Sequence, residues 1–300
     1  MVVESLSKLF EKEKQATRTG DSRRLAPDRH PNRDFFVADI LDWALKADRH
    51  SMEHPMFSLA KNPDKRIRRY DHNGISVTVT PSVLGIATIW DKDILIYAIS
   101  QLIEAINQAR PVTRTLRLKA YDLLVATNRH TGGENYDRLV EAFRRLAGTR
   151  IETNLASNGT RERRGFGLLE EWRIVEKSPT NDRMVALELT LSEWLYRAVC
   201  AREVLTLNRD YFRLDGGLER RLYELARKHC GNQPQWKIGM GLLHTKSGST
   251  APLKKFRQHI KAITRLPDYS LSYQIETDQV TFERQDVSVY QAPTSSDQAP

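Results

Sequence analysis

Hydrophobic residues along this chain follow helical and strand-like spacings, and the same order of spacings occurs twice. In the first copy, apolar residues at steps of three and four predict helices over residues 91–109, 118–128 and 135–147. Two adjacent glycines precede the third helix and favour a turn there, because glycine adopts positive φ at little cost. A hairpin follows, with strands predicted over residues 150–155 and 166–176. This order is typical of a winged helix-turn-helix domain.

The second copy has the same order with weaker periodicity. Apolar stripes predict helices over residues 218–229 and 238–244, and a third helix over residues 252–266 that begins at a proline. Strands over residues 269–276 and 280–284 complete the set. The chain is therefore predicted to have an α+β fold built from two tandem winged helix-turn-helix domains.

Both ends of the chain are polar and lie outside these domains. Residues 1–33 contain too little hydrophobic surface to offset the entropy cost of folding, and residues 285–300 are rich in Ser, Thr, Pro and Gln. We expect a flexible N-terminal arm and a disordered C-terminal tail. We assign residues 34–185 to a first winged-helix domain for dimerisation and backbone contact. Residues 186–284 are assigned to a second winged-helix domain that reads sequence.

Lys and Arg outnumber Asp and Glu by 47 to 38, which gives a formal net charge of +9. This excess favours a polyanionic partner, either nucleic acid or an acidic membrane face. The most apolar stretch, residues 94–106, is shorter than the ~20 residues that span a bilayer. The N-terminal residues have no apolar core typical of a secretory signal, and the two cysteines form no metal-like pair. We expect a cytoplasmic protein that does not bind membranes.

The helix predicted over residues 252–266 is the strongest candidate for DNA contact. It contains no acidic residue, and its polar side follows steps of three and four away from the apolar stripe. A helix after a turn, apolar behind and basic in front, is what insertion into the major groove requires. An ordinary solvated cationic face would give the same pattern. The proposed reading residues are Lys254, Lys255, Arg257, Gln258, Lys261 and Arg265.

Basic residues in the first domain are predicted to contact the DNA backbone. They lie on the third helix and in the loop of the hairpin, which we interpret as a wing. Phosphate contacts of this kind position a protein without specifying sequence. A flexible, soluble loop is the alternative explanation for the hairpin residues. The candidate backbone contacts are Arg144, Arg145, Arg161, Arg163 and Arg164.

Two short motifs resemble catalytic signatures but lack parts that the chemistry requires. Residues 50–54 read His-Ser-Met-Glu-His, the order of an inverted zinc-peptidase motif, yet Pro55 disfavours a helix at the second histidine. Residues 241–247 end in Lys-Ser as a phosphate-binding loop does, but Thr245 stands where that loop needs glycine. We therefore expect no enzymatic activity, no cofactor and no metal.

Five ordered blocks carry a resemblance to a known family. They are residues 54–59 (His-Pro-Met-Phe-Ser-Leu), 65–70 (Lys-Arg-Ile-Arg-Arg-Tyr), 88–93 (Thr-Ile-Trp-Asp-Lys-Asp), 144–149 (Arg-Arg-Leu-Ala-Gly-Thr) and 253–256 (Leu-Lys-Lys-Phe). Together these blocks resemble the replication initiator protein A family of bacterial plasmids. The resemblance extends over about residues 33–284.

This resemblance implies a function that the residues alone do not give. Such initiators are expected to bind repeated duplex DNA sites, called iterons, at an origin. They are also expected to recruit the host initiator ATPase and the replicative helicase, and to repress their own gene as a homodimer. The alternatives are a winged-helix transcriptional repressor, a single-stranded DNA-binding protein and a zinc peptidase.

Overall fold

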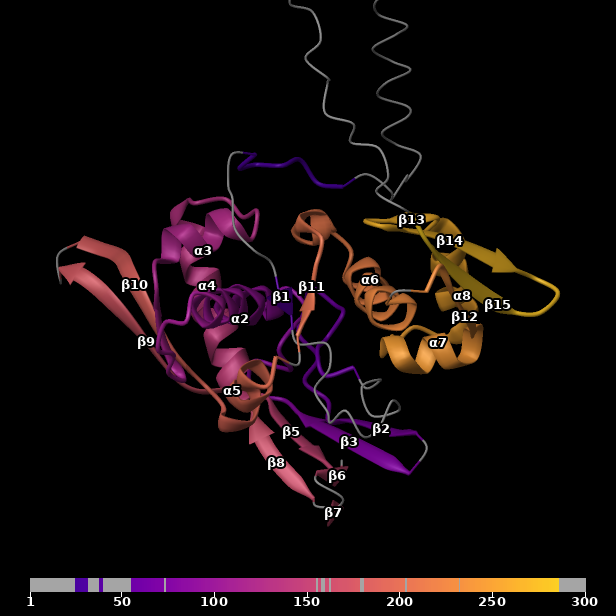
Figure 1. Cartoon of the computed structure of the whole chain (residues 1–300), viewed down its shortest axis with the longest axis horizontal. Coiled ribbons are helices and arrows are strands. Elements are labelled where there is room, and N and C mark those ends of the chain that lie inside the picture. The colour runs from indigo at the N-terminus through magenta and orange to yellow at the C-terminus, as the bar shows by residue number, and fades with distance from the viewer. Residues whose placement is uncertain are drawn as a thin grey trace, which may run out of the picture.

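The computed structural model consists of two winged-helix domains whose hairpins lie at opposite ends of the molecule (Figure 1). The predicted α+β fold with tandem winged helices is confirmed. The structure describes residues 25–31, 38–39, 55–72, 74–154, 156–157, 160–161, 163–178, 181–202, 204–231 and 233–285.

The first winged helix has three helices and a three-stranded antiparallel sheet. In this sheet β10 lies between β4 and β9, so the strand before the second helix pairs with the last strand of the wing. Alternating leucines explain the pairing, because Leu116 and Leu187 to Leu191 place every second side chain in the core. The elements are α2 (Lys92–Asn107), β4 (Thr115–Leu118), α3 (Ala120–Ala126), α4 (Gly133–Gly148), β9 (Leu169–Ser178) and β10 (Asn181–Leu191).

The second winged helix repeats this topology. Here β15 lies between β12 and β14, in the same way that β10 lies between β4 and β9. A short fourth strand, β13, extends the sheet beyond β14. The elements are the 3-10 helix η1 (Arg209–Arg213), α6 (Gly217–Cys230), β12 (Gln235–Gly239), α7 (Met240–Ser247), α8 (Leu253–Ala262), β13 (Arg265–Leu266), β14 (Tyr269–Gln274) and β15 (Gln279–Arg284).

The hairpin expected as the first wing belongs to a separate sheet, which corrects the interpretation made from the sequence. Its strands β5 and β8 join a hairpin from earlier in the chain, in the order β2-β3-β5-β8. The chain bends at Leu168, directly after Gly167. A Cβ at Gly167 would lie 3.1 Å from the carbonyl oxygen of Leu169. This bend splits the strand predicted over residues 166–176, and the true wing is β9–β10. The strands are β2 (Arg68–His72), β3 (Ile75–Thr80), β5 (Arg150–Thr153) and β8 (Arg164–Gly167).

The remaining elements are short. The helix after β10 begins at Ser192, whose side chain accepts a hydrogen bond from the Leu195 amide at 3.3 Å. Two pairs of two-residue strands form minor ladders. These elements are α5 (Glu193–Cys200), the pair β1 (Ala38–Asp39) with β11 (Leu205–Thr206), and the pair β6 (Ala156–Ser157) with β7 (Thr160–Arg161).

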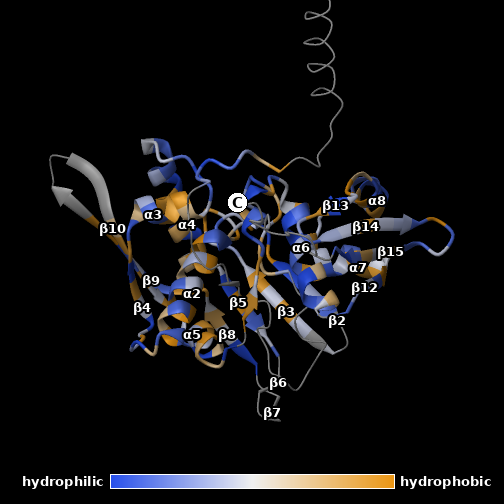
Figure 2. Ribbon diagram, turned by 45° about the horizontal axis from the view of Figure 1, so that its top comes forward, coloured by the Kyte–Doolittle hydropathy of each residue, from blue (hydrophilic) through white to orange (hydrophobic). Residues whose placement is uncertain are grey.

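Each domain has its own hydrophobic core, and α2 contributes to both. Hydrophobic residues gather where the helices of each domain meet its sheet (Figure 2). Ile94, Leu95 and Ala98 of α2 pack in the first core, whereas Ile96 packs in the second. This double burial explains why residues 94–106 are the most apolar stretch of the sequence. Among the described residues, no helix is both long and apolar enough to cross a bilayer.

The division between the domains lies later in the chain than expected. The expected limit after residue 185 falls inside β10, which is paired with both β4 and β9. The helix α5 that follows also packs in the first core, through Leu195 and Val199. Val204 packs against the first core, whereas the next residue, Leu205, packs against the second. We therefore place the end of the first domain after α5.

Candidate nucleic-acid interface

The helix α8 packs against the second hydrophobic core on one side and exposes basic residues on the other. Phe256 and Ile260 are buried in the second core, and Phe256 contacts the His244 ring at a centroid distance of 4.8 Å. The opposite side of the helix is open to solvent. The exposed residues there are Lys254, Lys255, Gln258, His259 and Lys261. The structure thus places five of the six proposed reading residues on one helix, namely Lys254, Lys255, Arg257, Gln258 and Lys261.

Arg257 is held by the tip of the wing in the same domain. Its Nε donates to Asp278 Oδ1 at 3.1 Å, and its Nη2 donates to Asp278 Oδ2 at 3.0 Å. The Tyr273 hydroxyl also donates to Asp278, at 2.7 Å. Hydrogen bonding to Arg257 and Tyr273 lowers the pKa of Asp278, and the same contact with Asp278 raises the pKa of Arg257. The guanidinium is therefore oriented at the tip of the wing within the folded domain.

This clamp could not be anticipated from the sequence. The strands predicted over residues 269–276 and 280–284 place Asp278 between them, but its contact with Arg257, 21 positions earlier, is tertiary. Lys261 joins the same group, with Nζ 5.1 Å from the centre of the Tyr273 ring. Such a contact is a cation–π interaction, which restrains the lysine over the strand.

Arg265 is not part of the reading helix, contrary to expectation. The helix ends at Ala262, and Ile263 has extended backbone angles. Arg265 instead pairs with Ser270 in the β13–β14 ladder. Pro267 follows this short strand, and proline cannot continue a helix. Its side chain is exposed beside the helix rather than on it.

The corresponding helix of the first domain, α4, has a charge-balanced outer face. Arg138 pairs with Glu134 one turn earlier, whereas Arg144 is exposed. Arg145 points inward and forms two bonds with Asp91, Nε to Oδ2 at 2.7 Å and Nη2 to Oδ1 at 2.8 Å. These bonds raise the pKa of Arg145 and occupy its guanidinium within the domain. We therefore remove Arg145 from the candidate DNA contacts.

The basic loop of the first domain lies at the end of the separate sheet β2-β3-β5-β8, not on the wing. Arg163 and Arg164 are exposed there, and Arg163 pairs with Glu152 on the neighbouring strand β5. Arg161 belongs to the short strand β7, and its side chain is outside what the structure describes. The loop remains a basic surface, although it is not the element that winged helices use beside their recognition helix.

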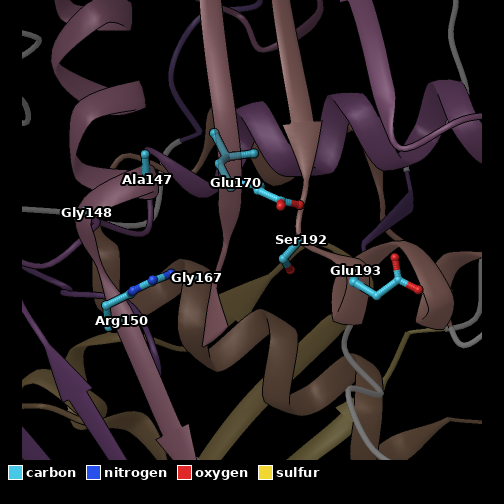
Figure 3. Close-up of a pocket in the computed structure, with 8 residues that line it drawn as sticks. Ala147, Gly148, Arg150, Gly167, Glu170, Ser192 and Glu193 are labelled. Atoms are coloured by element: carbon cyan, nitrogen blue, oxygen red, sulfur yellow. The ribbon is translucent and has the colours of Figure 1, made fainter. Parts of the chain in front are cut away.

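One polar cleft of about 520 Å³ lies where α4 ends and α5 begins (Figure 3). Arg150 and Gly167 line one side, and Glu170 and Glu193 line the other. Both carboxylates lie close to Arg114, at 2.6 Å and 3.6 Å from its Nη1. The two lining carboxylates therefore share one arginine as an ion-pair partner, an arrangement typical of structural surface networks.

The metal-like motif at residues 50–54 lies outside the described residues. Within the part of the chain that is described, no group of three His, Cys, Asp or Glu side chains could hold a metal ion. Cys200 and Cys230 are both free thiols, exposed and buried respectively. Burial raises the pKa of Cys230 to about 11, so this thiol is protonated and unreactive at neutral pH.

Comparison with known proteins identifies the family. A protein of Wigglesworthia glossinidia brevipalpis, assigned to replication, is 39% identical over 258 residues, which are 84% of this chain and 94% of that protein. A solved structure of RctB domains 2 and 3 has a TM-score of 0.53 at 12% identity, over 77% of this chain and 96% of its own. A second RctB structure gives 0.53 at 14% identity, over 76% and 94%. These two structures share the fold. The sequence pattern of replication initiator protein A matches residues 46–271, and the chain belongs to that family.

Proposed function

We propose that this protein is a replication initiator that binds repeated duplex DNA sites at an origin and performs no catalysis itself. The observation that carries the proposal is the exposed, acid-free face of α8. In a winged helix, the helix after the turn enters the major groove. There Lys and Arg can donate to the two acceptors of guanine, and Gln258 can pair with adenine.

The first domain is proposed to position the protein rather than to read bases. Arg144 on α4 and the exposed pair Arg163 and Arg164 would contact phosphates. Because phosphates are the same in every sequence, these contacts add affinity but little discrimination. A chain that reads bases with its second domain (the reader) and contacts phosphates with its first (the anchor) would bind an extended site of two parts.

Family membership supports the remaining parts of the proposal. A replication initiator without a nucleotide-binding loop must obtain ATP-driven strand opening from other proteins. We therefore propose recruitment of the host initiator ATPase and the replicative helicase. Repression of its own gene by a homodimer belongs to the same proposal.

Nuclease footprinting on the DNA beside its own gene tests this function. An initiator should protect several tandem repeats in phase, and deleting those repeats should abolish maintenance of a plasmid that depends on the protein. Protection of one palindrome, with unchanged plasmid copy number after its deletion, would instead identify a transcriptional repressor. Preference for single strands over any duplex would identify a single-stranded DNA-binding protein.

A further inference from the structure

The two winged helices meet through a buried charge network at the start of α2. Lys92 Nζ lies 2.8 Å from Glu224 Oε1, and Arg220 Nη1 donates to Asp93 Oδ1 at 2.6 Å. Each of the four residues is at most 4% exposed. Both pairs join the first helix of one domain to the first helix of the other. Charges at this depth are tolerated only with partners, so separating the domains would leave them unpaired.

Within this network the surrounding cations favour the charged form of the Glu224 carboxyl. Burial alone would raise the pKa of Glu224, but the nearby charges of Lys92 and Arg221 hold the pKa below its usual value. The Tyr211 hydroxyl donates a further bond to Glu224 at 2.7 Å. A charged, fully bonded cluster has one favourable geometry, in contrast to an apolar contact that can slide.

The same network reaches the helix-turn-helix of the first domain. Arg129, in the turn before α4, donates from Nη2 to Asp93 Oδ2 at 3.1 Å. The neighbouring Asn128 donates from Nδ2 to the carbonyl of Pro27 at 3.0 Å. One residue earlier in that N-terminal segment, Ala26 exchanges two 2.8 Å bonds with Arg213 of the second domain. The turn before α4 is thus connected to the second domain by two routes. One runs through Asp93 to Arg220, and the other runs through the N-terminal segment to Arg213.

The helix-turn-helix of the second domain also contacts the first domain directly, through Gly248. Gly248 ends α7 with a φ of +70°, and a Cβ there would lie 2.2 Å from Cγ of Pro55. Its carbonyl accepts a 3.4 Å bond from Arg68 Nη1, on strand β2. Arg68 is itself held by Asp64, with Nη2 2.9 Å from Oδ2. The turn before α8 therefore contacts the first domain at Pro55 and at Arg68, which is itself held by an ion pair.

We propose that these cross-domain contacts fix the distance and angle between α4 and α8, so that the protein accepts only one spacing between the two parts of its DNA site. The inference rests on the proposed function and names the residues that set its specificity for spacing: Lys92, Asp93, Arg220, Glu224 and Gly248. Adding one base pair moves one part of the site by about 3.4 Å and roughly 35° around the duplex. A domain pair locked by buried ion pairs cannot follow that movement.

The test uses a double variant, Lys92→Met with Asp93→Asn. It removes one positive and one negative charge, so the net charge is unchanged. Arg220 and Glu224 remain one turn apart on α6, where they can pair with each other. The matched control is Asp91→Asn with Arg145→Gln, which removes an ion pair that lies within the first domain, with side chains 5% and 13% exposed.

Binding is measured by fluorescence anisotropy on a duplex that the unmodified protein selects from a randomised pool, with one or two base pairs added or removed at its centre. The unmodified protein and the control should lose ~10-fold or more in affinity for each base pair, the scale of a mismatched contact. The double variant should keep its affinities within ~3-fold across the series. Equal spacing selectivity in both variants would overturn the inference.

A second measurement does not depend on DNA. Spin labels on the exposed Cys200 and on Lys237→Cys place one label in each domain, while buried Cys230 stays unlabelled. The distance distribution between labels should broaden in the double variant and in Gly248→Ala, which displaces Pro55. Broadened distances with unchanged spacing selectivity would refute the inference and leave the proposed function intact. If the unmodified protein selects no duplex, the proposed function fails and the spacing inference fails with it.

Discussion

The helices α4 and α8 occupy equivalent places in the two domains, yet they differ on the side that faces away from the core. Behind each helix a phenylalanine is buried, Phe143 at 1% exposure and Phe256 at 0%. On the outer side, α4 has Arg138 paired with Glu134, whereas α8 has no acidic residue. The scaffold of a recognition helix is therefore conserved between the copies, while its charge is not. The difference in charge supports the proposal that the first copy contacts phosphates and the second reads bases.

The largest expected effect tests whether the two scaffolds are equivalent. Phe143→Ala and Phe256→Ala should each lower the free energy of unfolding by ~3–5 kcal/mol, because each leaves a cavity behind its helix. Chemical denaturation followed by circular dichroism measures this. A loss below about 1 kcal/mol for one of them would show that its helix is not anchored as the structure indicates.

Removing Arg257 should weaken the preference of α8 for its own sequence. Arg257→Ala should reduce discrimination by ~1–3 kcal/mol if the arginine contacts guanine. Asp278→Asn, which releases the guanidinium without removing it, is the matched control. If the control reduces discrimination as much as Arg257→Ala does, Arg257 acts as a clamp for the wing and not as a reader.

Acid should destabilise the second domain, because this domain contains a partly buried histidine, His229, at the end of α6. Desolvation, with repulsion from Lys228, Lys246 and Arg221, lowers the pKa of His229 from 6.5 to about 3. The unfolded chain takes up a proton near 6.5 and the folded chain does not, so stability falls as the pH drops below 6.5.

Between pH 7 and pH 5 this difference amounts to about 2 kcal/mol. Denaturation of the unmodified protein and of His229→Gln at both pH values measures it. The substitution should remove most of the pH dependence, whereas the exposed His259→Gln should retain it. An unchanged slope in His229→Gln would place the acid sensitivity elsewhere.

The smallest effect concerns the first domain, which we propose contacts phosphates. Arg163→Ala should weaken binding to every duplex by a similar factor and should reduce the slope of log affinity against log salt by about one. The loss is expected to be small, because Arg163 already shares its charge with Glu152. A change in sequence preference would move Arg163 from the anchor to the reader.

The order of the helices was predictable because it depends on local periodicity. The predicted helix at 135–147 is α4, and the predicted helix at 218–229 is α6, each within two residues at either end. The strand β10 was missed, although Leu187, Leu189 and Leu191 alternate with polar residues as a half-buried strand does. Recognising that alternation would have placed the first wing correctly.

The partners of individual side chains were not predictable, because they are set by tertiary contacts. Arg144 and Arg145 are adjacent and identical in sequence, yet one is exposed and the other is bonded to Asp91. Helix geometry separates neighbours by about 100°, so only the packing of α4 decides which arginine points inward. The same holds for Lys92 and Asp93, whose partners lie more than a hundred residues away.

The most direct test of the reader and the anchor compares two variants that each lose two positive charges. Anisotropy of Lys254→Ala/Lys261→Ala and of Arg144→Ala/Arg163→Ala is followed across a salt series, on DNA from beside the gene and on a shuffled duplex. The unmodified protein should prefer its own DNA by ~10³-fold or more. The α8 variant should lose most of that ratio, and the first-domain variant should keep it while binding both duplexes more weakly. An equal ratio for both variants, or a greater loss in the first-domain variant, would contradict the account.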